Sequence, residues 1–125
     1  MIGYFHDGPQ KYPDPRLAQI YPPQANFIGV VGKHEYHTFN QRVYELMKVE
    51  AGIDVQMIDG PSVEHLATLS DQSSYWRFDI PALMINDTSF IRNPNYHQMS
   101  DDIDTLNFDH MTEAVSCVYR AAVGL

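Results

Sequence analysis

Residues 90–104 read FIRNPNYHQMSDDID, a polar and turn-rich segment between a predicted strand and a predicted helix. The segment carries one histidine, His97, with three aspartates shortly after it. The apolar run at residues 80–85 that precedes it is typical of a buried strand. Because α/β proteins usually keep their chemistry on loops at the ends of core strands, residues 90–104 are the first candidate for a functional site.

Apolar runs upstream predict two more strands, at residues 27–31 and 53–58. A helix is expected between them at residues 34–50, and a short helix at residues 70–78 precedes the strand at residues 80–85. Strands that alternate with helices predict an α/β domain with a mainly parallel sheet.

The two ends of the chain carry other patterns. Residues 1–5 are apolar and aromatic, and we interpret them as the end of a strand. Residues 8–24 contain five prolines, which predicts an ordered but irregular loop. After an N-cap at Asn107, the final helix is expected to face the sheet through an apolar stripe formed by Phe108, Met111, Val115, Val118 and Ala122.

Composition limits the classes of function. The chain of 125 residues is 44% hydrophobic and 19% charged, which predicts one folded domain over residues 1–125. Its net charge is -8 and its basic residues form no cluster, which argues against a nucleic-acid partner. The single cysteine, Cys117, excludes an intrachain disulfide and a Cys-rich zinc site. No apolar run approaches the roughly 18 residues of a membrane span, and the start of the chain lacks signal-peptide features. We therefore expect a soluble protein without a membrane partner, and its compartment stays open.

The setting of His97 favours a metal ligand. Pro94 restricts the loop, Asn93 can form an Asx turn, and Tyr96 can anchor the segment. Asp101 follows four residues after His97 and could accept a hydrogen bond from the imidazole, as carboxylates do behind zinc-bound histidines. The sequence therefore predicts His97 as a metal ligand and Asp101 as its orienting partner. The alternative is that the aspartates only cap turns and the last helix.

Other catalytic patterns are weaker. His34 and His37 lie three residues apart and could share a helix face, but they lack the glutamate and the i, i+4 spacing of helical zinc motifs. We interpret them as part of a solvated face. The chain has no Gly-x-Ser-x-Gly motif and Cys117 falls within the last predicted helix, which argues against a serine or cysteine hydrolase.

The sequence resembles the C-terminal part of the two-zinc aminopeptidases, the family of bacterial leucyl aminopeptidases with glutamate carboxypeptidase and glutaminyl cyclase relatives. The run NPNYH, ending at His97, is the most specific match. The segment SDQSSYW at residues 70–76 resembles the family pattern Ser-Asp-His-x-x-Phe/Tyr-Trp. The resemblance extends over essentially the whole chain, through residues 1–4, 26–32, 79–88, 92–97, 100–101 and 103–108 and Met111.

This resemblance implies a three-layer α/β sandwich of the zinc exopeptidase-like phosphorylase/hydrolase type, with a partial sheet. It implies that His97 is the last ligand of two zinc ions, which bind the substrate's amine and carbonyl and activate a water molecule. Asp101 would orient His97, and Tyr96, Arg92 and Asn93 would shape a pocket for a peptide or aminoacyl substrate.

The resemblance also predicts what the chain lacks. The other family ligands, a histidine and several acids including the general base, would precede Met1, and Gln72 replaces a family histidine. Because a catalytic zinc needs about three protein ligands, we expect no peptidase activity from this chain alone. An exposed sheet edge near Met1 would favour a homo-oligomer.

Two alternatives stay open. One is a non-enzymatic α/β interaction module that uses the polar loop as a contact surface. The other is a self-contained hydrolase in which His97 and Asp101 activate a water molecule. It is ranked last because the chain offers neither a nucleophile nor a complete set of metal ligands.

Overall fold

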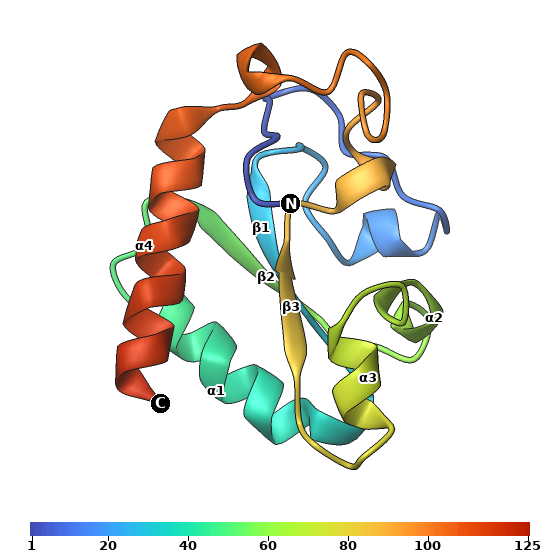
Figure 1. The fold of residues 1–125 in the computed structure, drawn as a ribbon, viewed down its shortest axis with the longest axis vertical. Coiled ribbons are helices and arrows are strands. Elements are labelled where there is room, and N and C mark those ends of the chain that lie inside the picture. The colour runs from blue at the N-terminus through green and yellow to red at the C-terminus, as the bar shows by residue number, and fades with distance from the viewer.

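The computed structural model describes residues 1–125 as an α/β fold with a small three-stranded mixed sheet and four helices (Figure 1). The strands and helices follow in the order β1 (Phe27–Gly32), α1 (His37–Lys48), β2 (Asp54–Ile58), α2 (Glu64–Ala67), α3 (Gln72–Trp76), β3 (Leu83–Asn86) and α4 (Phe108–Gly124). Short 3-10 segments lie at Leu17–Gln19, His34–Tyr36, Ser89–Ile91 and Ile103–Thr105. The three predicted strands are therefore confirmed.

The sheet has the order β2-β1-β3, with β1 at its centre. Strand β1 pairs with β2 in parallel and with β3 in antiparallel, so the sheet is mixed and the expectation of a mainly parallel sheet is not confirmed. The connection after β2 folds into α2 and α3 without crossing back along the sheet. The chain thus enters β3 from the carboxyl end of β1, where Leu83 pairs with Gly32.

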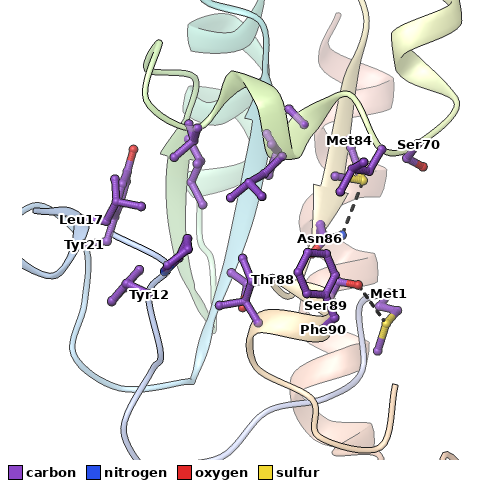
Figure 2. A pocket seen from close by; sticks show the side chains of 18 of the residues that line it. Met1, Tyr12, Leu17, Tyr21, Ser70, Met84, Asn86, Thr88, Ser89 and Phe90 are labelled. Carbon is purple, nitrogen blue, oxygen red and sulfur yellow. Dashed lines mark hydrogen bonds between the residues drawn. The ribbon is translucent and has the colours of Figure 1, made fainter. Parts of the chain in front are cut away.

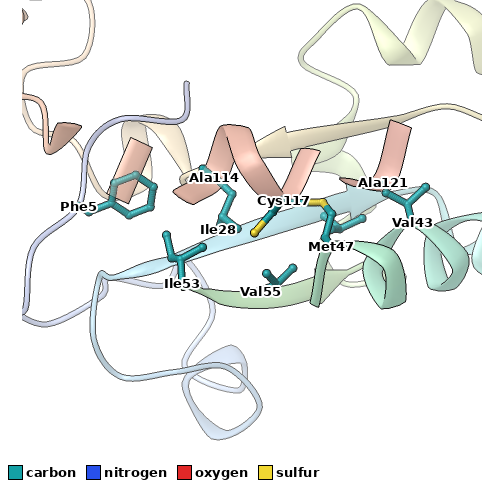
Figure 3. Packing of buried hydrophobic residues seen from close by; sticks show 10 residues of the cluster. Phe5, Ile28, Val43, Met47, Ile53, Val55, Ala114, Cys117 and Ala121 are labelled. Carbon is teal, nitrogen blue, oxygen red and sulfur yellow. The ribbon is translucent and has the colours of Figure 1, made fainter. Parts of the chain in front are cut away.

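One face of the sheet packs against α1 and α4 (Figure 3). Ile28 and Val55 from the strands meet Met47 of α1 and the small residues Ala114 and Cys117 of α4. The predicted stripe on α4 is therefore wrong in its position. Its members Phe108 and Val115 are 49% and 51% exposed, whereas the buried face consists of Ala114, Cys117 and Ala121. Small side chains allow α4 to lie close to α1, which large ones at these positions would prevent.

The other face of the sheet is covered by the irregular segment of residues 8–24 together with α2 and α3. Phe27, Val31 and Ile58 from the strands form a second core with Leu17, Val63, Ala67 and Trp76. The Trp76 indole donates a hydrogen bond to the carbonyl of Ala82 at 2.9 Å, which joins α3 to the segment before β3. Both faces of β1 are thus buried, as its continuous apolar sequence predicts.

Residues 1–5 form no strand, contrary to expectation, although Phe5 joins the core beside α4. The segment lies instead against the loop that follows β3, where the N–H of Asp87 donates to the carbonyl of Met1 at 3.0 Å. None of the helices is both long and apolar enough to cross a membrane.

Candidate functional site

The loop after β3 is held in place by Asp87, a fully buried carboxylate. Its Oδ2 accepts hydrogen bonds from the backbone N–H groups of Gly3 and Tyr4, each at 3.0 Å. Its Oδ1 accepts from the N–H of Ser89 at 3.1 Å. Thr88 and Ser89 turn the chain here with φ of 69° and 50°, an arrangement that these hydrogen bonds stabilise. Asp87 therefore joins the N-terminal segment to the start of the candidate loop.

Arg92 lies inside the protein, not on an open pocket wall. The residue is only 5% exposed, and its Nη1 donates a hydrogen bond to the carbonyl of Phe27 at 2.9 Å. Nε donates to Oε1 of Gln10 at 2.7 Å, and the guanidinium lies 4.6 Å from the ring centre of Phe27. Burial lowers the pKa of Arg92 to about 10, while the charge of Asp87 acts in the opposite direction. In this structure Arg92 links the loop to β1 and to the segment before it.

Asn93 and Asp101 interact with each other. The buried Asn93 donates from Nδ2 to Oδ1 of Asp101 at 3.4 Å, and its Oδ1 accepts from the N–H of Asn95 at 2.9 Å. The second bond is the Asx turn that the sequence predicted. The hydrogen bond of Asp101 thus goes to Asn93, and none joins it to His97. The orienting role of Asp101 stays a prediction.

His97 lies on the surface and stacks on its neighbour. The imidazole and the ring of Tyr96 are 3.9 Å apart between centroids and 17° from parallel. The backbone of His97 has φ of 57°, so the loop presents this ring from a left-handed turn. His97 belongs to no cluster of three metal-ligand side chains within these residues. A catalytic zinc at this position would need ligands besides His97.

A mainly apolar cavity of about 390 Å³ lies on the side of the sheet opposite α1 and α4 (Figure 2). Tyr12, Leu17 and Tyr21 from the N-terminal segment line it together with Met84 of β3 and Phe90 of the loop. Burial raises the pKa of Tyr12 to about 12. The volume and lining suit an apolar side chain or a small apolar ligand.

Tyr96 connects the cavity to the candidate loop. Its ring contributes to the cavity lining and also carries the stacked ring of His97. Arg92 and Asn93, which were predicted to shape a pocket with Tyr96, do not line this cavity. Arg92 and Asn93 are buried and support the loop, and of these three residues only Tyr96 lines the cavity.

Comparison with known proteins gives a partial match. No family model matches the chain. It is 36% identical over 120 residues to the uncharacterized protein YfbL of Escherichia coli K12, a match that covers 94% of this chain and 37% of that protein. Two structures of the Legionella pneumophila aminopeptidase LapA are similar, with TM-scores of 0.62 and 0.65 at 26% and 25% identity. This chain resembles one part of an aminopeptidase.

The matches cover nearly all of this chain but only part of each relative. The LapA comparisons cover 97% and 98% of the chain, but only 28% and 29% of the aminopeptidase. The chain likewise spans little more than a third of YfbL. What the rest of these proteins contributes to activity therefore lies outside the residues described.

The structure brings together one further group that sequence reasoning set aside. His34, His37 and the buried Asp59 place one metal-ligand atom each within 4.8 Å of one another. The sequence separates Asp59 from His37 by a helix and a strand, so a local pattern misses it. The order of the elements offered one indication of this group. His34 follows β1 and Asp59 follows β2, and adjacent parallel strands place their carboxyl ends side by side.

Proposed function

We propose that this chain is the C-terminal part of a two-zinc aminopeptidase-like domain and contributes to a catalytic site that it does not hold alone. The observation that supports this is the similarity to LapA over nearly the whole chain, at 25–26% identity. The specific run from Asn93 to His97 follows a core strand, where α/β proteins place functional loops. In the complete domain, the small sheet would extend into a three-layer sandwich.

The number of metal ligands in the loop decides whether this chain can hold zinc by itself. A catalytic zinc takes about three protein ligands, and the loop offers one imidazole, at His97, with Asp101 bonded to Asn93. The chain alone does not fit two zinc ions, so no hydrolytic step is assigned to it. In a complete domain, zinc ions would polarise a carbonyl and activate water.

The chain's own residues would perform two tasks in that domain. Tyr96 restricts the orientation of the His97 imidazole by stacking on it. Asp87 and Arg92 fix the loop through hydrogen bonds to the backbone of Gly3 and of Phe27. The apolar cavity next to Tyr96 would receive an apolar side chain of a peptide or aminoacyl substrate. Such a pocket beside a metal-bound histidine would position a terminal residue of the substrate close to the metal.

The outer face of α4 supports the view that further chain covers this part. Four apolar side chains on one side of α4 are 49–70% exposed and follow one another at one or two turns: Phe108, Val115, Tyr119 and Val123. We propose that the remainder of the longer polypeptide, which makes up about two-thirds of the E. coli relative, packs on this stripe. Strands β2 and β3 lie at the two edges of the sheet, and in the isolated chain these unpaired edges would favour self-association.

A chimera tests the proposed function. The matched 120 residues of YfbL are replaced by this chain, and bound zinc and hydrolysis of aminoacyl-4-nitroanilides are measured for the parent and the chimera. We expect zinc in both proteins, chelator-sensitive hydrolysis, and in His97→Ala a lower zinc content with loss of activity. The exposed His65→Ala serves as the matched control and should change neither. A folded chimera whose zinc content ignores His97→Ala would contradict the proposal.

A further inference from the structure

The β1-α1-β2 unit carries a second group of side chains with metal-ligand chemistry, apart from the loop of His97. His34 begins the 3-10 segment after β1, His37 begins α1, and Asp59 follows β2. Because β1 and β2 are parallel neighbours, their carboxyl ends lie side by side and bring the three residues together. Their ligand atoms all lie within 4.8 Å of one another.

The carboxylate of this group is buried and fixed. Asp59 is 7% exposed, and its Oδ2 accepts from Nδ2 of the fully buried Asn40 at 3.1 Å. Asn40 also donates to the carbonyl of Lys33 at 2.9 Å, so one amide ties the ends of both strands together. Gly32 makes this possible, because a Cβ there would collide with the Asn40 side chain. The chain therefore holds Asp59 in one orientation, toward the histidines.

The two imidazoles lie at the surface beside this carboxylate. Nδ1 of His37 is 2.8 Å from Oδ2 of Asp59, while the ring of His34 lies 5.8 Å from the ring of His37. His34 and His37 are both exposed, so their rings can rotate without disturbing the core. Lys33, which directly precedes His34, forms an ion pair with Glu35, so its ammonium is held by another partner.

The geometry points to a binding site for Zn²⁺ or a similar divalent transition metal, formed by His34, His37 and Asp59. Two imidazoles with one carboxylate are a donor set that zinc favours, whereas Mg²⁺ and Ca²⁺ prefer oxygen ligands. A tetrahedral ion with ligand bonds of about 2.0–2.2 Å would separate its donor atoms by roughly 3.3 Å. The His37–Asp59 pair needs to open by less than about 1 Å to reach that spacing. Three protein ligands leave one position for water or a ligand.

The simpler reading is that His37 and Asp59 form only a hydrogen bond that fixes the start of α1 to the end of β2. That interpretation involves only His37 and Asp59, whereas the exposed His34 places its ligand atom within 4.8 Å of both. His34 therefore separates the two readings. The proposal is also independent of the proposed function, because it does not involve His97.

The test is metal titration of the purified chain, without a histidine tag and stripped of metal, by calorimetry with Zn²⁺ and by the visible absorption of Co²⁺. We expect one ion per chain and a tetrahedral Co²⁺ spectrum. His34→Ala and Asp59→Asn should each weaken binding by at least the roughly 10–100-fold that loss of an outer partner costs. His97→Ala and His65→Ala should bind as the original chain does.

Several results would overturn the site. These are the absence of stoichiometric binding, unchanged affinity in His34→Ala, loss of binding in His97→Ala, or binding only in a dimer bridged by metal, as seen by light scattering. Asp59→Asn removes a buried group and can disturb the fold, so circular dichroism accompanies each variant. His34 is exposed, and its replacement tests the site without that complication.

Discussion

Replacing Arg92 by alanine tests whether this residue supports the loop. The substitution removes the hydrogen bonds from Nη1 to the carbonyl of Phe27 and from Nε to Gln10, at 2.9 and 2.7 Å. It also removes the guanidinium from the ring of Phe27, 4.6 Å away. The two acceptors lose their donor, and a buried space is left beside Phe27.

The opposing contributions set the size of the effect. Two hydrogen bonds from a charged donor contribute about 3–6 kcal/mol together, and a cation–π contact adds about 1 kcal/mol. Burial acts against them, because lowering the pKa of Arg92 to about 10 disfavours the charged form by roughly 3 kcal/mol. Nη2 is buried without a partner, which limits the gain further. We expect Arg92→Ala to lower the free energy of unfolding by about 1–4 kcal/mol.

Urea unfolding followed by the fluorescence of Trp76 measures this change. The matched control is Arg77→Ala, which removes an exposed arginine and should alter stability by less than about 0.5 kcal/mol. Arg92→Lys keeps the charge but cannot donate in two fixed directions, so an intermediate loss is expected. Equal stability of Arg92→Ala and Arg77→Ala would refute the supporting role.

Three further predictions concern the core, the cavity and the N-terminal segment. Met47→Ala should lower the free energy of unfolding by about 2–5 kcal/mol, because Met47 is fully buried, while Met99→Ala, at an exposed position, should leave the denaturation midpoint unchanged. Burial raises the pKa of Tyr12 to about 12, so above pH 10 the unfolded chain loses this proton before the folded chain does. The free energy of unfolding should therefore fall between pH 10 and 12, and fall less steeply in Tyr12→Phe, as measured by urea denaturation at each pH. Asp87→Ala leaves the N–H of Gly3 without its acceptor, so hydrogen exchange there should accelerate; unchanged exchange would contradict the tether.

The sequence predicted the strands well because each is a short apolar run. It did not predict the direction of β3, since an apolar run reads the same whichever way the strand enters the sheet. It also misplaced the buried face of α4. Large residues such as Phe108 and Val115 dominate a hydrophobic pattern, whereas the close approach to α1 selects the small residues Ala114 and Cys117.

The turn residues predicted a loop after the third strand, and the structure has that loop, but the contacts within it depend on distant parts of the chain. Arg92 bonds to Phe27 and Gln10, which lie 65 and 82 residues away, so no local pattern indicates its burial. The same holds for Asp59, which meets His37 across 22 residues of sequence. Local pattern shows which residues can do chemistry, and strand pairing decides which of them meet.

The central claim is that these 125 residues contribute one ligand, His97, to a two-zinc site that other chain must complete. The most direct measurement is hydrolysis of aminoacyl-4-nitroanilides by the purified chain in the presence of Zn²⁺, with and without a chelator. We predict no turnover above the uncatalysed rate, even when zinc occupies the group of His34, His37 and Asp59. Chelator-sensitive turnover by this chain alone, abolished in His97→Ala, would contradict it.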